Sequence, residues 1–430
     1  MNFPKTVKRF YVLNNLQPNW LREEQNVGST TSAMLLLDCI KHYGLQHENY
    51  HPEILNYALM HDILNKKNIV TAAQKIEFEL MLTDAMVSMI NHLHYGRLNP
   101  SLSEAAIDNG SSLKLRADEF LINVANNPYL MDSILTVQPK IKQYQQLQDY
   151  LRLITGQYAC DSFELPEPEI REIALNMERL RWTELNTDKY LQVNIPSFYL
   201  SYITRDSITS FKVVIGKPST PTPTLLSEIL YIETAPDWRI PKKIFIKELL
   251  PRAEKDIAYF ENNHITIYDE KGNILEVNKA SIISIKKNSK KFHSIQSSGC
   301  DNALGKVVFR FNNPYDIYLH DTPEQQYFTR SNRALSHGCI RVEQAENLGA
   351  LLLTHDDQHR RVRQLTAAMK AFRKQKFSLK APMPILITYL TITVEDGLLT
   401  RHEDIYKLDT ALEAKMYAGT EKLTNIIHKK

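Results

Sequence analysis

The sequence lacks long apolar runs, a leader peptide and an excess of either charge, and each absence narrows its class. Among its 430 residues no stretch of about 18 apolar residues occurs, so we expect no transmembrane helix. The N-terminus has no apolar signal-peptide segment, which leaves a cytoplasmic protein or one whose export signal has been removed. The 52 basic and 49 acidic residues leave a net charge of +3, which gives no support to a nucleic-acid partner.

Cysteine is equally scarce. The chain contains four, Cys39, Cys160, Cys300 and Cys339. They are too few for a disulfide scaffold, and no two have metal-ligand spacing, so the sequence implies neither a metal site nor a cofactor. Cys39 lies in an apolar run and is expected in the core. Cys160 lies in an expected loop and carries no chemical signal.

Residues 1–187 have the periodicity of helices. Between Ala72 and Leu93 apolar residues recur close to every 3.6 positions, and Glu167–Trp182 has a second apolar stripe. No internal repeat or low-complexity segment interrupts this region. We therefore predict an all-α domain over residues 1–187.

The pattern changes near residue 188, where short stretches rich in β-branched and aromatic residues begin. Strands are expected over residues 190–203, 210–216, 225–234, 306–311, 317–320 and 384–394, with a hairpin at Arg205-Asp206. Two helices are expected at about 343–354 and 357–373. The block of about 238–289, with its own helix near 247–262, is predicted to be an inserted subdomain. The second domain, over residues 188–420, is thus expected to be mainly β.

One stretch near residue 340 carries the chemical signal of the chain. Fifteen residues separate His320 from Ser336-His337-Gly338-Cys339, a small-residue turn that ends in a cysteine. A cysteine attacks a carbonyl as the thiolate, and a nearby imidazole is the usual means of removing its proton. The turn can also point successive N–H groups at one oxyanion. A nucleophile, a base and an oxyanion site together predict acyl transfer.

Of the two histidines, His320 at the end of an expected strand is the better base. His337 is interpreted as an oxyanion-site or substrate contact, with a packed turn residue as the alternative. Asp321 could orient the imidazole, or only cap the turn that follows it. Ser297-Ser-Gly-Cys300 nearly repeats the motif, but Asp301 would oppose thiolate formation, so we interpret this segment as a loop.

Four further side chains are candidates for substrate contact. Arg341 and Arg333 could each clamp a substrate carboxylate with paired hydrogen bonds, or pair with a nearby acid instead. Trp238 and Tyr318 could line a substrate groove, and the alternative for Trp238 is a packing anchor. The cluster Lys286–Lys291 is interpreted as a solvated loop rather than as a site for acidic substrate.

The spacing of His320 and the Ser-His-Gly-Cys-Ile-Arg segment resembles the signature of L,D-transpeptidases with a YkuD-type catalytic domain. Further segments resemble the larger, YcbB-like branch of that family: Val193-Asn-Ile-Pro, Val213-Val-Ile-Gly-Lys-Pro, Pro236-Asp-Trp-Arg-Ile-Pro, Ala303-Leu-Gly-Lys, Ile317-Tyr-Leu-His-Asp-Thr-Pro and Asp404-Ile-Tyr. In that branch a helical scaffold domain precedes a catalytic β-sandwich, and a capping subdomain is inserted over the active site. The resemblance implies a scaffold domain over residues 1–187, a YkuD-like β-sandwich over 188–420, and a cap over about 238–289.

The resemblance also implies an activity. Cys339, deprotonated by His320, would attack the meso-diaminopimelate–D-alanine bond of a peptidoglycan tetrapeptide stem and release D-alanine. The acyl group would pass to the amine of a second stem as a 3→3 cross-link. The resemblance further implies carbapenem-type inhibitors that acylate Cys339, no metal, and a place in the periplasm or cell envelope, with the export signal absent from this chain. A hydrolase that resolves the thioester with water, and a non-catalytic cell-wall scaffold, are the alternatives.

Overall fold

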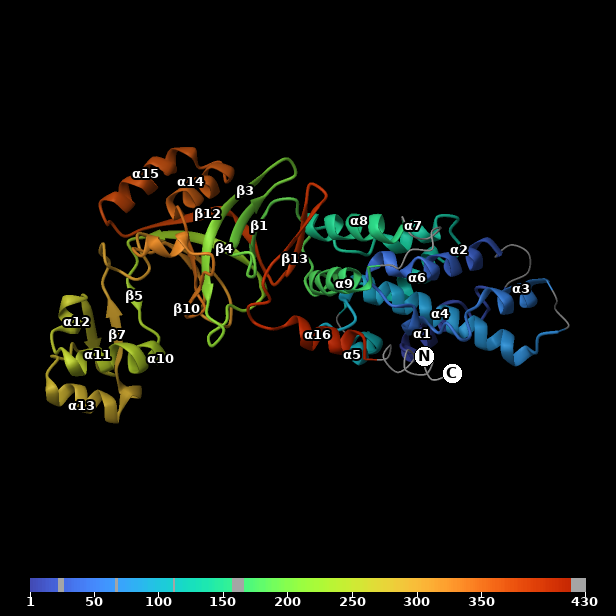
Figure 1. Cartoon of the computed structure of the whole chain (residues 1–430), viewed down its shortest axis with the longest axis horizontal. Coiled ribbons are helices and arrows are strands. Elements are labelled where there is room, and N and C mark those ends of the chain that lie inside the picture. Colours follow the sequence, from blue (N-terminus) through green and yellow to red (C-terminus); the bar gives the residue numbers. More distant parts are fainter. Residues whose placement is uncertain (22–26, 66–68, 111–112, 157–165, 419–430) are drawn as a thin grey trace. The chain divides into compact units, whose positions relative to one another are not determined.

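The computed structural model describes residues 1–21, 27–65, 69–110, 113–156 and 166–418. Contacts divide the chain into two compact units (Figure 1), residues 1–187 with 389–430, and residues 188–388. Helices build the N-terminal part and strands most of the second unit, so the predicted fold class is confirmed. None of the helices within those ranges combines the length and the apolar character that crossing a bilayer requires. Cys160 lies outside the described residues.

The first unit is organised around one long helix, α4 (Ala72–Tyr95). It begins with a capping box, in which Thr71 accepts the amide of Gln74 and Gln74 reaches back to the amide of Thr71. Its remaining helices are α1 (Pro4–Leu13), α2 (Val27–Asp38), η1 (Ile40–Tyr43), η2 (His47–Tyr50), α3 (Tyr57–Asn65), α5 (Glu104–Asn109), α6 (Ala117–Val124), α7 (Leu130–Leu135), α8 (Lys142–Gly156) and α9 (Glu167–Arg181).

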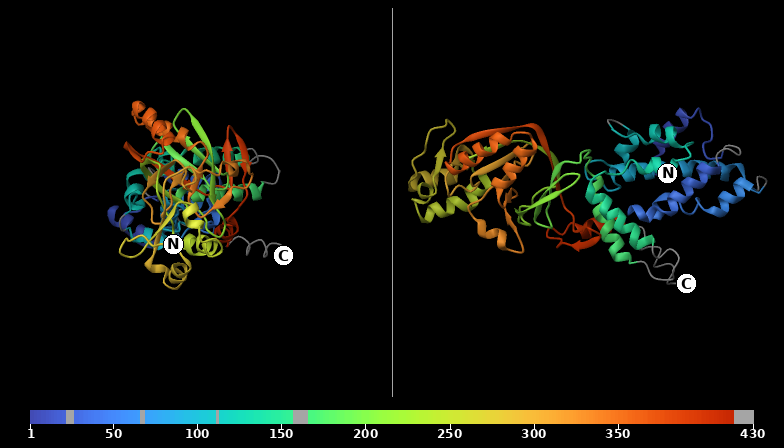
Figure 2. Two further views of the ribbon diagram at one scale, coloured as in Figure 1. Left: turned by 90° about the vertical axis from the view of Figure 1, so that its left-hand side faces the viewer. Right: turned by 90° about the horizontal axis from the view of Figure 1, so that it is seen from above.

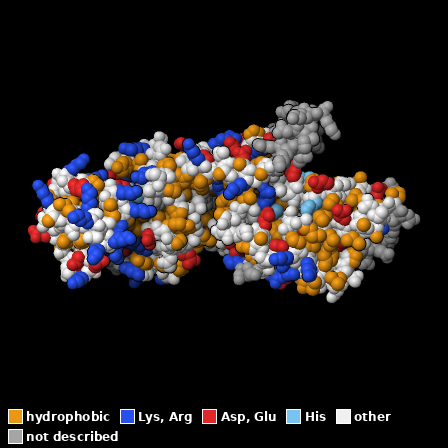
Figure 3. All heavy atoms as spheres, turned by 90° about the horizontal axis from the view of Figure 1, so that it is seen from below, with side chains coloured by type: hydrophobic (Ala, Val, Ile, Leu, Met, Phe, Trp, Pro, Cys, Tyr) orange, Lys and Arg blue, Asp and Glu red, His pale blue; other side chains and the backbone are white. Residues whose placement is uncertain are grey.

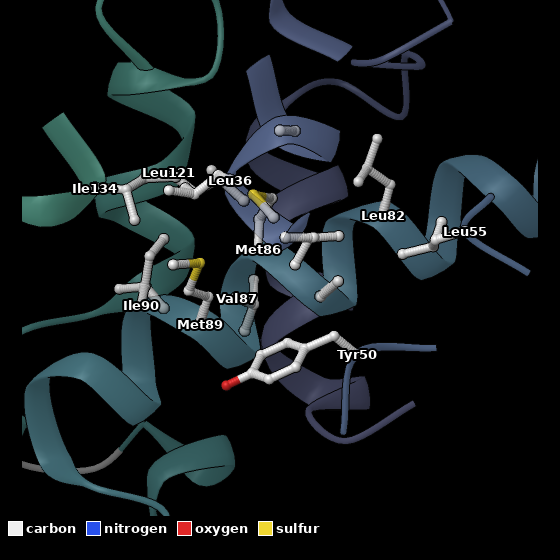
Figure 4. Close-up of a cluster of buried hydrophobic side chains, with 14 of the residues drawn as sticks. Leu36, Tyr50, Leu55, Leu82, Met86, Val87, Met89, Ile90, Leu121 and Ile134 are labelled. Atoms are coloured by element: carbon white, nitrogen blue, oxygen red, sulfur yellow. The ribbon is translucent and has the colours of Figure 1, made fainter. Parts of the chain in front are cut away.

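The core of this unit surrounds α4. Nearly every side chain of α4 from Phe78 to Leu93 is buried, as expected for a helix enclosed by others. Figure 4 shows part of this core, where side chains of α4 meet those of α2, α6 and α7: Met86, Ile90, Leu36, Leu121 and Ile134. Cys39 is partly buried and packs against the same cluster, close to the predicted core position.

Residues 389–418 belong to the first unit, although the sequence placed the end of the second domain at 420. They form β13 (Ile392–Glu395), β14 (Leu398–Arg401) and α16 (Asp409–Met416). On α9, Asn176 accepts the amide of Thr391 at 2.9 Å, and Arg179 pairs with Asp409 at 2.6 Å. Both α9 side chains are buried by these contacts. Contacts group residues 389–418 with the first unit because α9 finds polar partners far along the chain.

The second unit is a nine-stranded sheet in the order β10-β3-β11-β9-β8-β4-β12-β1-β2. β3 also pairs with β2, so the sheet closes on itself through this strand. The segment predicted as one strand over 190–203 is two strands separated by a turn. The strands are β1 (Tyr190–Asn194), β2 (Tyr199–Ile203), β3 (Ile208–Gly216), β4 (Leu225–Thr234), β8 (Val307–Phe311), β9 (Leu319–His320), β10 (Ala334–Ser336), β11 (Ile340–Val342) and β12 (Gln375–Thr388).

Helices α14 (Ala345–His355) and α15 (His359–Lys370) cover one face of this sheet (Figures 1 and 2). One apolar, fully buried side chain from each of five neighbouring strands lies on that face: Phe377, Ile232, Phe309, Leu319 and Ile340. Gly349 of α14 allows the close approach, since a Cβ there would stand 2.8 Å from Leu365. Side chains alternate along a strand, so the residues adjacent to these five point to the opposite face.

The inserted subdomain has a small core of its own, which includes Phe260 and Ile285. Its strands pair in the order β5-β7-β6. Because β7 pairs with β5, the subdomain extends to Gln296, beyond the predicted end at 289. The helix predicted near 247–262 is interrupted between α11 and α12. The elements are β5 (Trp238–Arg239), α10 (Lys242–Ile244), η3 (Phe245–Leu249), α11 (Leu250–Lys255), α12 (Tyr259–Asn262), β6 (Ile265–Tyr268), α13 (Lys279–Lys287), η4 (Ser289–Lys291) and β7 (His293–Gln296).

Lysines of the predicted solvated cluster lie at the surface of this subdomain. Lys286 pairs with Glu254 at 2.5 Å, and Lys291 lies 3.8 Å from Glu270. Figure 3 shows Lys and Arg side chains, interspersed with acidic ones, over the part of the molecule that holds the subdomain. Exposed pairs of this kind contribute little to stability. The cluster is solvated as predicted, but it lies at the end of α13 and on η4 rather than in a loop.

Candidate active site

Strand pairing brings the two halves of the motif together. β9 runs parallel to β11, with Leu319 opposite Ile340 and His320 opposite Arg341. Ile340 also donates its amide to the carbonyl of Tyr318 at 3.1 Å. Because side chains alternate along these strands, four candidate side chains share the face opposite the helices: Tyr318, His320, Cys339 and Arg341.

The turn before the nucleophile is held by its own serine. The Ser336 hydroxyl accepts the amide of Gly338 at 3.1 Å and donates to the carbonyl of Cys339 at 2.6 Å. Thr222, in the segment that follows β3, also fixes this turn, because its hydroxyl donates to the carbonyl of Gly338 at 2.8 Å. Because the Gly338 amide already donates to Ser336, it is not free to donate to an oxyanion, although the sequence predicted it as one of the donors. Within the described chain, the amides of His337 and Cys339 donate to no other group.

The Cys339 thiol rests in its neutral form. It is partly buried, and its Sγ lies 4.0 Å from the carbonyl oxygen of Asp316. Burial raises the pKa of the thiol, while hydrogen bonds from the backbone and hydroxyl of Tyr318 and the charges of Arg310 and Arg341 act in the opposite direction. To act as a nucleophile, Cys339 would therefore have to lose its proton to a base.

His320 has the state that such a base requires. Its side chain is buried, and its Nδ1 lies 2.6 Å from the carbonyl oxygen of Asp321, so Nδ1 carries the proton and donates it there. Burial, aided by the charges of Arg341 and Arg310, lowers the pKa of His320 to about 3. The imidazole is neutral at neutral pH and can accept a proton.

The orienting group is the main-chain carbonyl of Asp321 rather than its carboxylate. The carboxylate accepts the amide of Lys306 at 2.9 Å. No hydrogen bond joins His320 to Cys339 among the residues described here; the Tyr318 ring, whose centre is 5.8 Å from that of His320, stands beside both. Catalytic hydrogen bonds often form only when substrate binds, so the lack of a bond between His320 and Cys339 is compatible with proton transfer between them in a complex.

Tyr318 and Trp238, the two aromatic candidates for substrate contact, lie near Cys339 and near each other. Burial raises the pKa of the Tyr318 hydroxyl, and both Cys339 and Trp238 lie close enough to that hydroxyl to affect its pKa. Trp238 is the first residue of β5, and it also packs against the core of the inserted subdomain. One tyrosine thus connects the nucleophile to the subdomain.

His337 is exposed and makes a second connection to the same subdomain. Its Nε2 lies 2.5 Å from a carboxylate oxygen of Glu248, which belongs to η3. Both side chains are about one-third exposed. The ring therefore points to the subdomain, while the His337 amide remains available on the turn.

The two predicted arginines are engaged by the protein itself. Arg341 pairs with Glu324 and lies 5.4 Å from the centre of the Tyr327 ring. Arg333 is buried, and its guanidinium donates to three main-chain carbonyls, those of Val213, Arg330 and Phe198. These contacts favour a structural role for Arg333 over the substrate contact that the sequence suggested.

One residue of this face, Arg310, was not among the candidates predicted from the sequence. On β8 it follows Val308, which is opposite His320, by two positions, and its guanidinium lies 4.5 Å from the centre of the Tyr318 ring. The available signal was that Arg310 is the single charged residue in the apolar strand Val307–Phe311. A single charged residue in an apolar strand does not indicate that β8 pairs with β9, the strand of His320.

The near-copy of the motif has a different setting. Cys300 is exposed and free, in the loop that follows β7. Its neighbour Asp301 lies 3.9 Å from His264 across a solvent-exposed contact. Within the described ranges, no group of three or more His, Cys, Asp or Glu side chains is placed to hold a metal ion.

Comparison with known proteins assigns both parts of the chain. Residues 188–357 match the family model described as the L,D-transpeptidase catalytic domain, YkuD, and residues 5–151 match the model described as a scaffold domain. A curated protein of Haemophilus influenzae, named "Putative L,D-transpeptidase", is 31% identical over 276 residues, which are 61% of this chain and 55% of that protein. The chain thus spans about half the length of the curated relative that it matches.

These matches agree with the class that the fold and the site define, a cysteine-containing catalytic domain that follows a helical domain. The chain contains a YkuD L,D-transpeptidase catalytic domain and a scaffold domain, and the scaffold domain fits the YcbB-like branch of that family.

Proposed function

We propose that this protein is a peptidoglycan L,D-transpeptidase whose nucleophile is Cys339. The observation that carries the proposal is the arrangement on one sheet face of a buried neutral His320, a neutral Cys339 thiol and Tyr318. The family match over residues 188–357 supports the reaction class. The substrate, the cross-link and the roles of the residues are part of the proposal.

In the first half-reaction, Cys339 is acylated by a donor tetrapeptide stem. His320 takes the thiol proton as Sγ bonds to the carbonyl carbon at the L-centre of meso-diaminopimelate. The amides of His337 and Cys339 face the oxyanion, because the Gly338 amide is already bonded to Ser336. The C–N bond then breaks, the D-alanine amine takes the proton from His320, and a thioester remains.

In the second half-reaction, the side-chain amine of an acceptor stem attacks the thioester. His320 receives a proton from the attacking amine, the C–S bond breaks, and the Cys339 sulfur recovers the proton. The product is a 3→3 cross-link, and the energy of the original peptide bond is conserved in the thioester. A carbapenem is expected to acylate the same sulfur, and the proposed place of action is the periplasm or cell envelope.

The experiment is incubation of the protein with a disaccharide-tetrapeptide and mass spectrometry of the products. A cross-linked dimer formed with loss of one D-alanine supports transfer. Tripeptide without dimer would show that water resolves the thioester and would replace the transferase by a hydrolase. No change in the tetrapeptide, with a folded protein, would favour a non-catalytic cell-wall scaffold.

A further inference from the structure

Arg310 is a cation on the sheet face that carries Cys339, and the side chain of Tyr318 lies between the two. Val308 lies opposite His320, so Arg310, two residues further along β8, shares the face of Cys339. The guanidinium carbon lies 4.5 Å from the centre of the Tyr318 ring, and the main-chain carbonyl of Tyr318 accepts the amide of Ile340, the residue that follows Cys339. A single aromatic side chain therefore separates this positive charge from the sulfur.

The guanidinium is only weakly paired within the protein. The Glu233 carboxylate is 3.8 Å away, beyond hydrogen-bond distance, and it also lies 3.9 Å from Lys374. Throughout the described chain, no other carboxylate approaches Arg310 within 4.0 Å. Its side chain is 29% exposed, so the charge is accessible to a solute.

The other two arginines near the nucleophile differ in this respect. Arg341 is paired with Glu324, and Arg333 donates to three main-chain carbonyls. Arginine presents a planar fork of N–H donors that matches a carboxylate. We propose that the Arg310 guanidinium binds a carboxylate of the donor stem beside the scissile bond, and that Arg310 thereby determines specificity in the acylation step.

This proposal rests on the proposed function, which supplies the ligand. The tetrapeptide offers two carboxylates close to the reacting carbonyl, that of D-alanine, three bonds away, and that of the D-centre of diaminopimelate, six bonds away. Neighbouring strands are about 4.8 Å apart, so Arg310, two strands from β11, starts about 10 Å from Cys339. Its side chain lies over Tyr318, on the strand between them. A carboxylate within one residue of the scissile carbonyl is therefore within its range.

The test compares stems that have or lack each carboxylate. The substrates are the disaccharide-tetrapeptide, its C-terminal D-alaninamide and its diaminopimelate side-chain amide, and the measured quantity is kcat/KM for consumption of the stem. The proteins are wild type, Arg310→Met and Arg310→Lys. The rate of Cys339 alkylation by iodoacetamide, a reagent with no carboxylate, is measured in parallel.

We expect wild type to favour the acid over one of the two amides by about 10- to 100-fold, as for one charge-assisted pair. In Arg310→Met that ratio should fall close to one, while Arg310→Lys recovers part of it. An amide substrate lacks one carboxylate. If its kcat/KM is the same for wild type and Arg310→Met, the carboxylate that it lacks is the one that Arg310 binds.

The matched control is Arg171→Met in the first unit. Arg171 lies 4.4 Å from the Tyr417 ring centre, 4.0 Å from a carboxylate oxygen of Glu413, and is 32% exposed. This control should leave the acid-to-amide ratio unchanged. An equal fall in all rates of Arg310→Met, iodoacetamide included, would overturn the proposal and leave only an effect on the thiol.

Failure of the two proposals can be told apart. Turnover of all three stems by wild type without discrimination would overturn only the assignment of Arg310. If wild type consumes no stem at all, the proposed function falls, and the assignment of Arg310 falls with it.

Discussion

Replacing Gly305 by alanine is expected to slow acylation of Cys339 markedly while the protein remains folded. Gly305 has a φ of +63° and stands against the residue that orients the base. An alanine Cβ would lie 2.5 Å from the Oδ2 atom of Asp321 and 2.7 Å from its main-chain carbonyl carbon. The oxygen of that carbonyl accepts the Nδ1 proton of His320. The new methyl group therefore acts on the base through one residue.

The magnitude follows from these distances. Ordinary contact begins near 3.4 Å, so the Asp321 main chain must retreat by roughly 0.7 Å in a close-packed interior. A displacement of this size costs about 10- to 100-fold in rate if His320 moves with it, since a misplacement of about 1 Å costs about 100-fold. The left-handed backbone of Gly305 adds about 1–2 kcal/mol of destabilisation in an alanine variant.

The assay is the rate of carbapenem acylation, followed by intact mass, together with the free energy of unfolding in urea. Gly397→Ala is the matched control, because Gly397 has a φ of +78° but nothing within 4 Å of its built Cβ. Both variants should lose similar stability from the backbone, and only Gly305→Ala should lose the rate. Equal acylation rates in the two variants would refute the link from Gly305 to the base.

Three further outcomes are expected. Because the pKa of His320 is lowered to about 3, the acylation rate should rise with pH near pH 3 and be flat from about pH 4 to 8, whereas an inflection near pH 6.5 would show an ordinary imidazole. Arg333→Met should lower the free energy of unfolding in urea by about 2–4 kcal/mol, because buried carbonyls lose their donors, with little change in the acylation rate of folded protein; the reverse pattern would make Arg333 a substrate contact. Glu248→Gln weakens the pair that holds the inserted subdomain near His337, so iodoacetamide should alkylate Cys339 faster. The expected increase is up to about 5-fold, because a partly exposed pair contributes about 0.2–1 kcal/mol. A slower reaction would contradict this role of the pair.

The parts of the structure that depend on local pattern could be predicted from sequence. α4 and α9 follow from the recurrence of apolar residues, and the strands of the second unit follow from their composition. His320 and Cys339 could be proposed as base and nucleophile because that chemistry depends on residue type and spacing. The parallel pairing of β9 with β11 then places both on one face.

The parts that depend on distant partners could not. The contacts that favour a structural role for Arg333 come from distant segments, since Phe198, 135 residues away, supplies a carbonyl to it. Arg310 was missed because its meaning depends on Tyr318 being on the adjacent strand. Residues 389–418 joined the first unit through polar contacts of α9, and an isolated polar position on a helix does not name its partner.

The most direct test of the central claim is to locate a covalent adduct after incubation with a carbapenem, by intact mass and peptide mapping. Wild type is expected to gain one carbapenem mass, carried by the peptide that contains Cys339, and Cys339→Ala is expected to gain none. Cys300 provides an internal comparison, because it is free and more exposed. An adduct on Cys300, the same adduct on Cys339→Ala, or no adduct on folded wild type would contradict Cys339 as the nucleophile.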